Sequence, residues 1–590
     1  MGKSALNMYL SVACLLGSIL VAIAPALAQE KRLTAPQLFP SKTIAYFRIN
    51  DARELRDRFS QSSIGKLFED QKMQSFLGTL QEGILKFTET MQNDLGLSLE
   101  ELLAIPNGEF AFAVVPTPKA PITCLMMEVG PEQPAVEILF KRHFDRTANL
   151  KRNETKIGDI QVVQLNDGES PNFGYFLHEG VFVATPESDY ISTLAKVWAG
   201  LETKHVSLSE NIDFTNLLSR CVGTQGERPQ VSFYVDPVGI FRENIRESPN
   251  VIMTLAAIKS IGLDGIKAAG GSLILATNDF DSILHLHLTL DNPRPGVLSA
   301  VRPKNGSTEP EAWVDDSVVS YLTMNWDFRA TLNAIRDIME AFAGEGSFAS
   351  NVEKSFSARF NLDLRKDVIE QLTGRVSMAT IILPERKINS QSRVIGVHLK
   401  DESFGASKLL PKFYEQVRKN DSRWKEKSVD GITVYYLPTT SNPERVVRRP
   451  SPAFCLLKNT ILLSDAIEAL EHAISVQKGG GTLLSDSVEF KLIRSKIKDQ
   501  LHGNEFSVMT YTRPDEQLKL FYELALDGEN VRRLKEASQG QAFLESLVQA
   551  LENKTLPPFE DIAKYLAPAG GFLTEEDNGL HFTTFTVRRD

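Results

Sequence analysis

Two histidines alternate with leucines in the segment Leu284–Leu288. Residues two apart in a strand point to the same side, so His285 and His287 would present two imidazoles on one face, as a transition-metal site requires. Asp279 and Asp281 precede them and carry the carboxylates that calcium prefers. The leucine alternation also suits any half-buried strand, and the acidic turn lacks the spacing of a calcium loop. These four residues are weak metal candidates, and we expect neither a bound metal nor another cofactor.

A second candidate site is the basic stretch that contains Arg445, Arg448 and Arg449. Clustered arginines could contact an acidic partner or the surface of the cell envelope. A solvated surface loop explains the same residues. They are therefore weak candidates for partner binding.

No pattern in the chain predicts catalysis. Ser63, Ser422 and Ser495 each precede a lysine by three residues, but the Lys-Thr-Gly element that accompanies this pattern in penicillin-binding enzymes is absent. The glycines Gly479–Gly481 lack the Lys-Ser/Thr of a phosphate-binding loop. A hydrolase whose site is assembled from distant residues stays open, because catalytic triads need not be local in sequence.

Composition excludes other classes of function. The 590 residues carry a formal net charge of −10, whereas nucleic-acid-binding proteins present a basic face. Four cysteines are too few for a small domain held together by disulfides. We expect no nucleic-acid partner, and a fold that depends on hydrophobic cores.

The N-terminus predicts export. Lys3 precedes an apolar stretch, Met8–Ile23, and the small-residue ending Ala26-Leu27-Ala28 follows. This is the pattern of a secretory signal peptide, with cleavage after Ala28. No later stretch is long and apolar enough to cross a bilayer. We therefore expect a periplasmic or extracellular protein without a transmembrane segment after cleavage.

The remaining chain contains an internal duplication. Collinear matches recur at an offset of about 265 to 300 residues, which is the signature of repeated units. The clearest pairs are Pro40–Asn50 with Asp315–Asn325, Leu208–Phe214 with Leu484–Phe490, and Ala269–Gly271 with Ala569–Gly571. The proposed organisation is a signal peptide (1–28), a first repeat (29–290), a linker rich in proline and glycine (291–311) and a second repeat (312–590).

Each repeat predicts an α+β fold. Short alternating or apolar strands such as Phe110–Val115 are joined by tight turns into hairpins, and helices such as Ser188–Trp198 follow. Runs of strands followed by helices indicate a mainly antiparallel sheet with helices packed on one face. The fold class is therefore α+β with two tandem related units. Whether the units share one sheet or form separate lobes is left open.

The segments Leu38–Ile49 and Ser63–Phe68, together with the signal peptide, resemble a group of large exported bacterial proteins classed as a domain of unknown function. The resemblance covers the first part of the mature chain and implies export but no catalytic residues. The leading hypothesis is an exported, non-catalytic binding or scaffolding protein of the bacterial cell envelope. The alternatives are the hydrolase and a carrier of a lipid or other apolar ligand, suggested by aromatic-rich strands and helices such as those containing Phe110–Phe112 and Phe76.

Overall fold

A computed structural model provides the structure of the chain. It describes residues 32–79, 105–130, 136, 151–166, 173–224, 226–385, 387, 389–439, 447–501, 503, 505–537 and 542–589. The predicted signal peptide and Arg445 lie outside the described residues.

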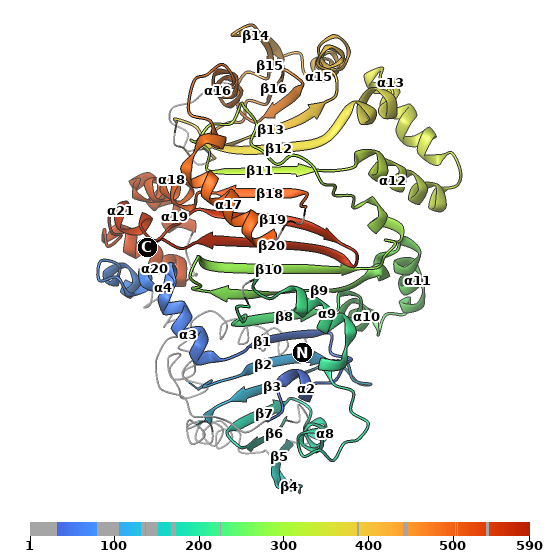
Figure 1. The fold of residues 1–590 in the computed structure, drawn as a ribbon, viewed down its shortest axis with the longest axis vertical. Helices are drawn as coiled ribbons and strands as arrows, with labels where there is room; N and C mark the ends of the chain where they lie inside the picture. Colours follow the sequence, from blue (N-terminus) through green and yellow to red (C-terminus); the bar gives the residue numbers. More distant parts are fainter. Residues whose placement is uncertain are drawn as a thin grey trace.

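All the described strands belong to one antiparallel sheet (Figure 1). The strands before residue 291 are β1 (Ala45–Ile49), β2 (Phe110–Val115), β3 (Ile122–Glu128), β4 (Lys151–Ile157), β5 (Ile160–Asn166), β6 (Phe173–His178), β7 (Val181–Thr185), β8 (Val231–Val235), β9 (Ile266–Leu275) and β10 (Phe280–Leu290). The later strands are β11 (Ser320–Asn325), β12 (Leu372–Ile382), β13 (Gln391–Leu399), β14 (Lys425–Val429), β15 (Ile432–Tyr436), β16 (Ala453–Leu457), β17 (Thr460–Ser464), β18 (Val508–Thr512), β19 (Ala569–Glu576) and β20 (Gly579–Val587).

The two halves of the sheet have corresponding strand orders, counted outward from the middle. On one side β10 is followed by β9, β8, β1, β2, β3, β7, β6, β5 and β4. On the other side β20 is followed by β19, β18, β11, β12, β13, β17, β16, β15 and β14. The two series meet where β10 pairs with β20, with His287 opposite His581. Both sequence ranges therefore contribute to one continuous sheet.

Four helices cover one face of the sheet and enclose its main cores. They are α8 (Ser188–Trp198), α9 (Ile212–Arg220), α16 (Ile467–Gln477) and α17 (Val488–Leu501). The helix α8 packs on β5 to β7, α9 on β8 to β10, α16 on β13 and β15 to β17, and α17 on β19. Alternation along the strands directs side chains such as Tyr46, Tyr321 and Phe585 into these cores, where each is at most 2% exposed.

The prediction that helices pack on one face only is incomplete. The helices α13 (Lys354–Phe360) and α15 (Leu410–Asn420) pack together, and residues around them cover Leu456 and Ile461. These two side chains point away from the face under α16, because their neighbours Cys455 and Leu462 lie in the core on that face. Strand β16 is apolar along its whole length, so both of its faces require cover.

The remaining helices of five or more residues lie beyond the ends of the strands (Figure 1). At one end are α3 (Ala52–Gln61), α4 (Ser63–Glu69), α18 (Pro514–Leu526), α19 (Gly528–Ala537), α20 (Ala542–Glu552) and α21 (Phe559–Ala563). At the opposite end are α10 (Pro237–Ile245), α11 (Val251–Ile261) and α12 (Phe328–Ala343). The shorter helices are α2 (Ala35–Leu38) and α14 (Glu402–Phe404). No helix in the described ranges combines the length and the hydropathy needed to cross a bilayer.

Candidate functional site

The four helices α18 to α21 form a small lobe between β18 and β19. The lobe lies beyond the ends of the strands (Figure 1). Apolar residues of its helices and of the segment around α4 line one common space. The packing is incomplete: Phe521 is 54% exposed and Leu518 is 37% exposed. A lobe that leaves large side chains uncovered has room for something else to pack against them.

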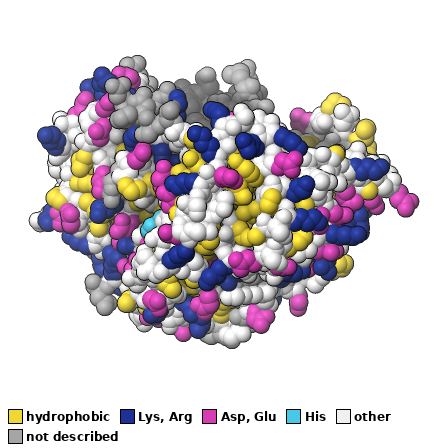
Figure 2. All heavy atoms as spheres, turned by 90° about the horizontal axis from the view of Figure 1, so that it is seen from above, with side chains coloured by type: hydrophobic (Ala, Val, Ile, Leu, Met, Phe, Trp, Pro, Cys, Tyr) yellow, Lys and Arg dark blue, Asp and Glu magenta, His cyan; other side chains and the backbone are white. Residues whose placement is uncertain are grey.

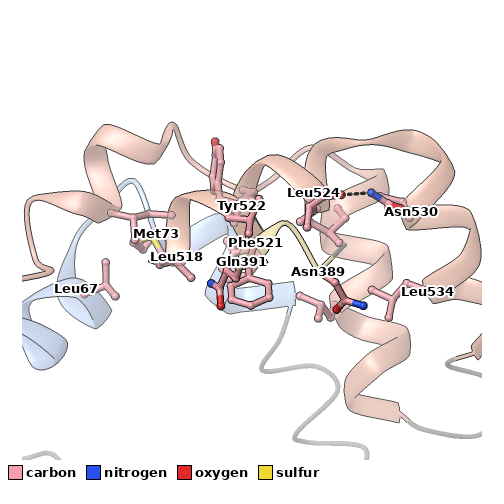
Figure 3. Close-up of a pocket in the computed structure, with 18 residues that line it drawn as sticks. Leu67, Met73, Asn389, Gln391, Leu518, Phe521, Tyr522, Leu524, Asn530 and Leu534 are labelled. Carbon is pink, nitrogen blue, oxygen red and sulfur yellow. Dashed lines mark hydrogen bonds between the residues drawn. The ribbon is translucent and has the colours of Figure 1, made fainter. Parts of the chain in front are cut away.

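A half-open cavity of about 730 Å³ lies between this lobe and the segment around α4 (Figure 3). Residues of α18, α19 and α20 form most of its described wall, among them Leu524, Leu534 and Leu551. Leu67 of α4 and Met73 close the side nearest the first half of the chain. An apolar cavity of about 150 Å³ is enough to bind benzene, so this space admits a considerably larger apolar molecule.

Three amide side chains interrupt the apolar wall among the described residues: Asn389, Gln391 and Asn530. Asn530 donates from Nδ2 to the carbonyl oxygen of Leu524 at 3.1 Å, the bond drawn in Figure 3. Its Oδ1 is buried and accepts no hydrogen bond from the protein, and Nε2 of Gln391 is buried and donates none. Both atoms are shielded from the open space, so the accessible wall is almost wholly apolar.

Ion pairs hold the segment after α4 against α21 at the border of the cavity. Asp70 accepts hydrogen bonds from Nζ of Lys564 at 2.7 Å and from the hydroxyl of Tyr565 at 2.8 Å. Nζ of Lys72 donates to Asp561 at 2.6 Å. The hydrogen bond from Lys564 is the largest of the contacts that hold the pKa of Asp70 well below its usual value. These pairs lie close in sequence to residues that do line the cavity, Met73 on one side and Ile562 on the other.

The histidines predicted from sequence lie elsewhere, in the middle of the sheet under α9 and α17. His285, His287 and His581 are 2% to 7% exposed on the same face of β10 and β20. Nδ1 of His285 lies 3.2 Å from Nε2 of His581 and 3.1 Å from the hydroxyl of Thr583. Both ring nitrogens of His287 are buried without a hydrogen-bond partner. The sequence pair thus gains a third imidazole from the other half of the sheet.

These imidazoles are held neutral by their surroundings. Burial lowers the pKa of His285 and of His287 to about 4, and it lowers the pKa of His581 to about 3. No group of three His, Cys, Asp or Glu side chains within the described residues has the arrangement of a metal site. The cluster is therefore a buried polar patch in the sheet.

The two acidic candidates do not join the histidines. Asp281 accepts a hydrogen bond from the backbone N–H of Ser63 at 2.6 Å, which anchors the start of α4 to β10. Asp279 forms an ion pair with Lys496 at 3.1 Å. The carboxylate of Asp281 therefore positions a cavity-lining helix.

The two described arginines of the predicted basic site lie in different surroundings. Arg448 is 9% exposed; it is ion-paired with Asp465 and donates to the carbonyl oxygen of Asn389 at 2.8 Å. Arg449 is exposed. On the face seen in Figure 2, basic and acidic side chains are interspersed. Arg448 thus anchors the loop that contributes Asn389 and Gln391 to the cavity.

Apart from Phe76, which suggested an apolar ligand, the described residues that line the cavity were not predicted from sequence. The connection between β18 and β19 covers residues 513–568, whereas the connection between β8 and β9 covers 236–265. This extra length between matched strands was the available signal. The extra length forms a cavity only together with α4, which lies more than 400 residues earlier in the chain.

Comparisons with known proteins add little. No protein-family profile matches the chain, and no curated protein matches it. Two solved structures, crystal forms I and IV of TP0453, align with 44% of this chain and with 80% and 81% of that protein. Sequence identity is 10% and 11%, and the TM-score is 0.22 for both. A similarity at this level assigns the chain to no family.

Proposed function

We propose that this chain is an exported, non-catalytic protein that binds one apolar molecule in the cavity between α4 and the lobe of α18 to α21. The observation that carries the proposal is the cavity of about 730 Å³ with its almost wholly apolar wall. This volume lies within the range of natural small-molecule sites. Of the functions expected from sequence, it favours a carrier of a lipid or other apolar ligand.

A bound molecule would also complete the packing of the lobe. Protein interiors contain few voids larger than a water molecule, because atoms beside a void lose their dispersion contacts. Phe521 and Leu518 are large apolar side chains that remain partly exposed at the cavity. An apolar occupant would remove this surface from water, which is the driving force for its binding.

The contacts of the reactive side chains favour binding over catalysis. Asp315 accepts hydrogen bonds from Ser317 at 2.8 Å and from His472 at 2.9 Å, so the carboxylate takes both partners and the serine does not bond to the histidine. A nucleophilic serine would need the histidine itself as its base. Burial raises the pKa of Cys124 to about 12, which suppresses its thiolate.

The same proposal treats 29–290 and 312–590 as diverged copies of one unit joined by 291–311. The mirrored strand order on either side of the β10 and β20 pair supports this organisation. On this reading the second copy acquired the longer connection that builds the cavity. Export with cleavage after Ala28 belongs to the proposal, and the N-terminal sequence of the protein recovered from culture medium or periplasm tests it.

The binding proposal is tested with a neutral apolar dye, N-phenyl-1-naphthylamine, titrated into the purified mature chain. We expect saturable fluorescence enhancement at one site. Leu551→Trp places a larger side chain in the cavity wall and is expected to weaken dye binding at least tenfold. Leu201→Trp is the matched control, because Leu201 is 59% exposed outside the cavity.

Two results would overturn the proposal. One is the absence of saturable dye binding to the unmodified chain. The other is equal dye affinity in Leu551→Trp and Leu201→Trp, with both variants folded by circular dichroism. Native mass spectrometry of the chain purified without detergent supplies an independent measurement, in which a bound apolar molecule gives a discrete added mass.

A further inference from the structure

We infer that two copies of this chain form a dimer by packing the open faces of their sheets against one another. The open face is the side of the ten inner strands that is turned away from α9 and α17 (Figure 1). These strands are, in spatial order, β2, β1, β8, β9, β10, β20, β19, β18, β11 and β12. This interface is separate from the cavity and does not depend on what the cavity binds.

Strand alternation makes the middle of the open face apolar. On β10, His285 and His287 point into the sheet face under α9 and α17, so Leu284, Leu286 and Leu288 point the other way. The residues paired with these three leucines on β9 and β20 are all uncharged: Leu273, Gly271, Ala269, Thr584, Phe582 and Leu580. An antiparallel sheet with one face in water carries polar residues at such positions. The composition of the open face is therefore that of a face that becomes covered.

No described element covers the middle of the open face. Its partly exposed apolar residues, which belong to none of the described hydrophobic cores, are Phe233, Leu273, Leu284, Leu286, Leu288, Leu322, Met324, Val376, Met378, Val508, Leu573, Leu580 and Phe582. Only at its margin do Phe47 and Phe112 pack beside Leu55 of α3. A contiguous apolar patch of this extent on a protein surface marks an interaction site.

The open face has the area that a stable dimer needs. Ten strands spaced about 4.8 Å apart span about 43 Å, and Leu284–Leu288 extends along about 17 Å. The footprint is thus roughly 700 Å², and two such faces would bury roughly 1,400 Å², within the roughly 1,200–2,000 Å² of stable specific interfaces. A single helix about 10 Å wide would cover only about a quarter of the span.

The relief of the open face also suits a second sheet. Gly271 lies opposite Phe233, and a Cβ on this glycine would lie 2.9 Å from Cζ of that ring and 3.1 Å from Cδ2 of Leu286. A Cβ on Gly571 would likewise lie 3.1 Å from Cζ of Phe582. These large side chains therefore lie across the glycines instead of projecting outward. Sheets that pack face to face sit about 10 Å apart, which a surface of low relief allows.

A second copy of the chain offers the matching surface. The pair of β10 and β20 lies at the centre of the open face, where Leu286 is opposite Phe582. Gly271 and Gly571 occupy corresponding places on β9 and β19. The two halves of the face thus resemble each other, and a two-fold dimer requires such a self-complementary surface. An uncharged face offers no complementary charge to an acidic or basic partner.

The test places a thiol at the centre of the open face with Leu286→Cys in the mature chain. Cys124, Cys221 and Cys455 are buried, so the introduced thiol should be the main site of reaction with a maleimide. Between roughly 0.1 and 20 µM protein we expect the labelling rate to fall at least tenfold, as association covers the face. Sedimentation velocity should show the mass doubling over the same range. Leu201→Cys is the control, because Leu201 is 59% exposed and outside this face.

A second substitution tests the interface without chemical labelling. Leu286→Asp places a charge at the centre of the contact and should keep the chain monomeric, with its circular dichroism unchanged because Leu286 lies outside the described cores. Val488→Asp is the matched control. Val488 is 82% exposed on α17, which covers the other face, so this variant should dimerise like the unmodified chain.

Three results would overturn the inference. One is a chain that stays monomeric at the highest concentration with a freely reactive thiol in Leu286→Cys. Another is a monomer in which that thiol is protected at every concentration, because a different occupant, such as a lipid, would then cover the face. The third is a dimer that persists in folded Leu286→Asp, because its interface would lie elsewhere.

Discussion

Acid should destabilise this protein well above the pH at which carboxylates are protonated. The cause is the cluster of His285, His287 and His581 in the middle of the sheet, which burial holds neutral. In the unfolded chain each histidine has a pKa of about 6.5. Between pH 6.5 and 4 the unfolded state therefore binds more protons than the folded state, so stability falls as the pH falls.

The size of the effect follows from the two pKa values. At pH 5 an unfolded histidine is almost fully protonated and a folded one with a pKa of about 4 is mostly neutral. This difference corresponds to about 2 kcal/mol for each imidazole relative to pH 7.5. For three imidazoles the loss is about 6 kcal/mol, a large part of the roughly 5–15 kcal/mol that stabilises a typical domain.

His472 works in the opposite direction. Its hydrogen bond to Asp315 raises its pKa, so its contribution to stability is present at low pH and is lost as the pH rises through that value. It therefore offsets part of the acid effect. The depressed pKa of Asp70 matters only below the unfolded value of about 4, outside this window.

The assay is urea unfolding followed by circular dichroism at pH 7.5, 6.5, 5.5 and 5.0. His287→Leu replaces the imidazole that has no hydrogen-bond partner, so about a third of the pH dependence should disappear with little loss of stability at pH 7.5. His205→Leu is the control, because His205 is only partly buried and its hydrogen bond to the carbonyl oxygen of Gln37 lies at the surface. An unchanged pH dependence in His287→Leu would refute the argument from burial.

Two other predictions concern contacts around the cavity. Asp70→Asn weakens the pairs with Lys564 and Tyr565, so it should speed release of N-phenyl-1-naphthylamine several-fold in stopped-flow measurements; an unchanged release rate would show that these pairs do not hold the cavity closed. Arg448→Leu removes the partner of Asp465 and the donor to the loop carbonyl, and it should lower the free energy of unfolding by about 2 kcal/mol. Chemical unfolding that matches the unmodified chain would contradict that role.

Sequence patterns predicted the elements that depend on local alternation. Phe110–Val115 and Ser188–Trp198 form a strand and a helix with the expected bounds, because apolar periodicity within one element reports which face is buried. The same reasoning placed His285 and His287 on one face of a strand. It could not place His581 beside them, because that contact depends on which strand of the second half meets β10.

Local sequence patterns could not predict the cavity for the same reason. Its wall combines Leu67 and Met73 with Leu551 and Ile562, residues brought together only by the order of strands across the whole sheet. The apolar spacing within α18 and α20 indicates helices, but it does not say which partner they pack against.

The pairing of β10 with β20 has a consequence for the chain while it is being synthesised and folded. Strand β20, residues Gly579–Val587, is synthesised and translocated long after β10, residues Phe280–Leu290. Until it arrives, β10 presents an unpaired edge of eleven residues, and long uncovered edges invite pairing with other chains. A chain shortened before Gly579 would keep that edge open permanently. The edge of β10 therefore depends on the distant strand β20 for protection from aggregation.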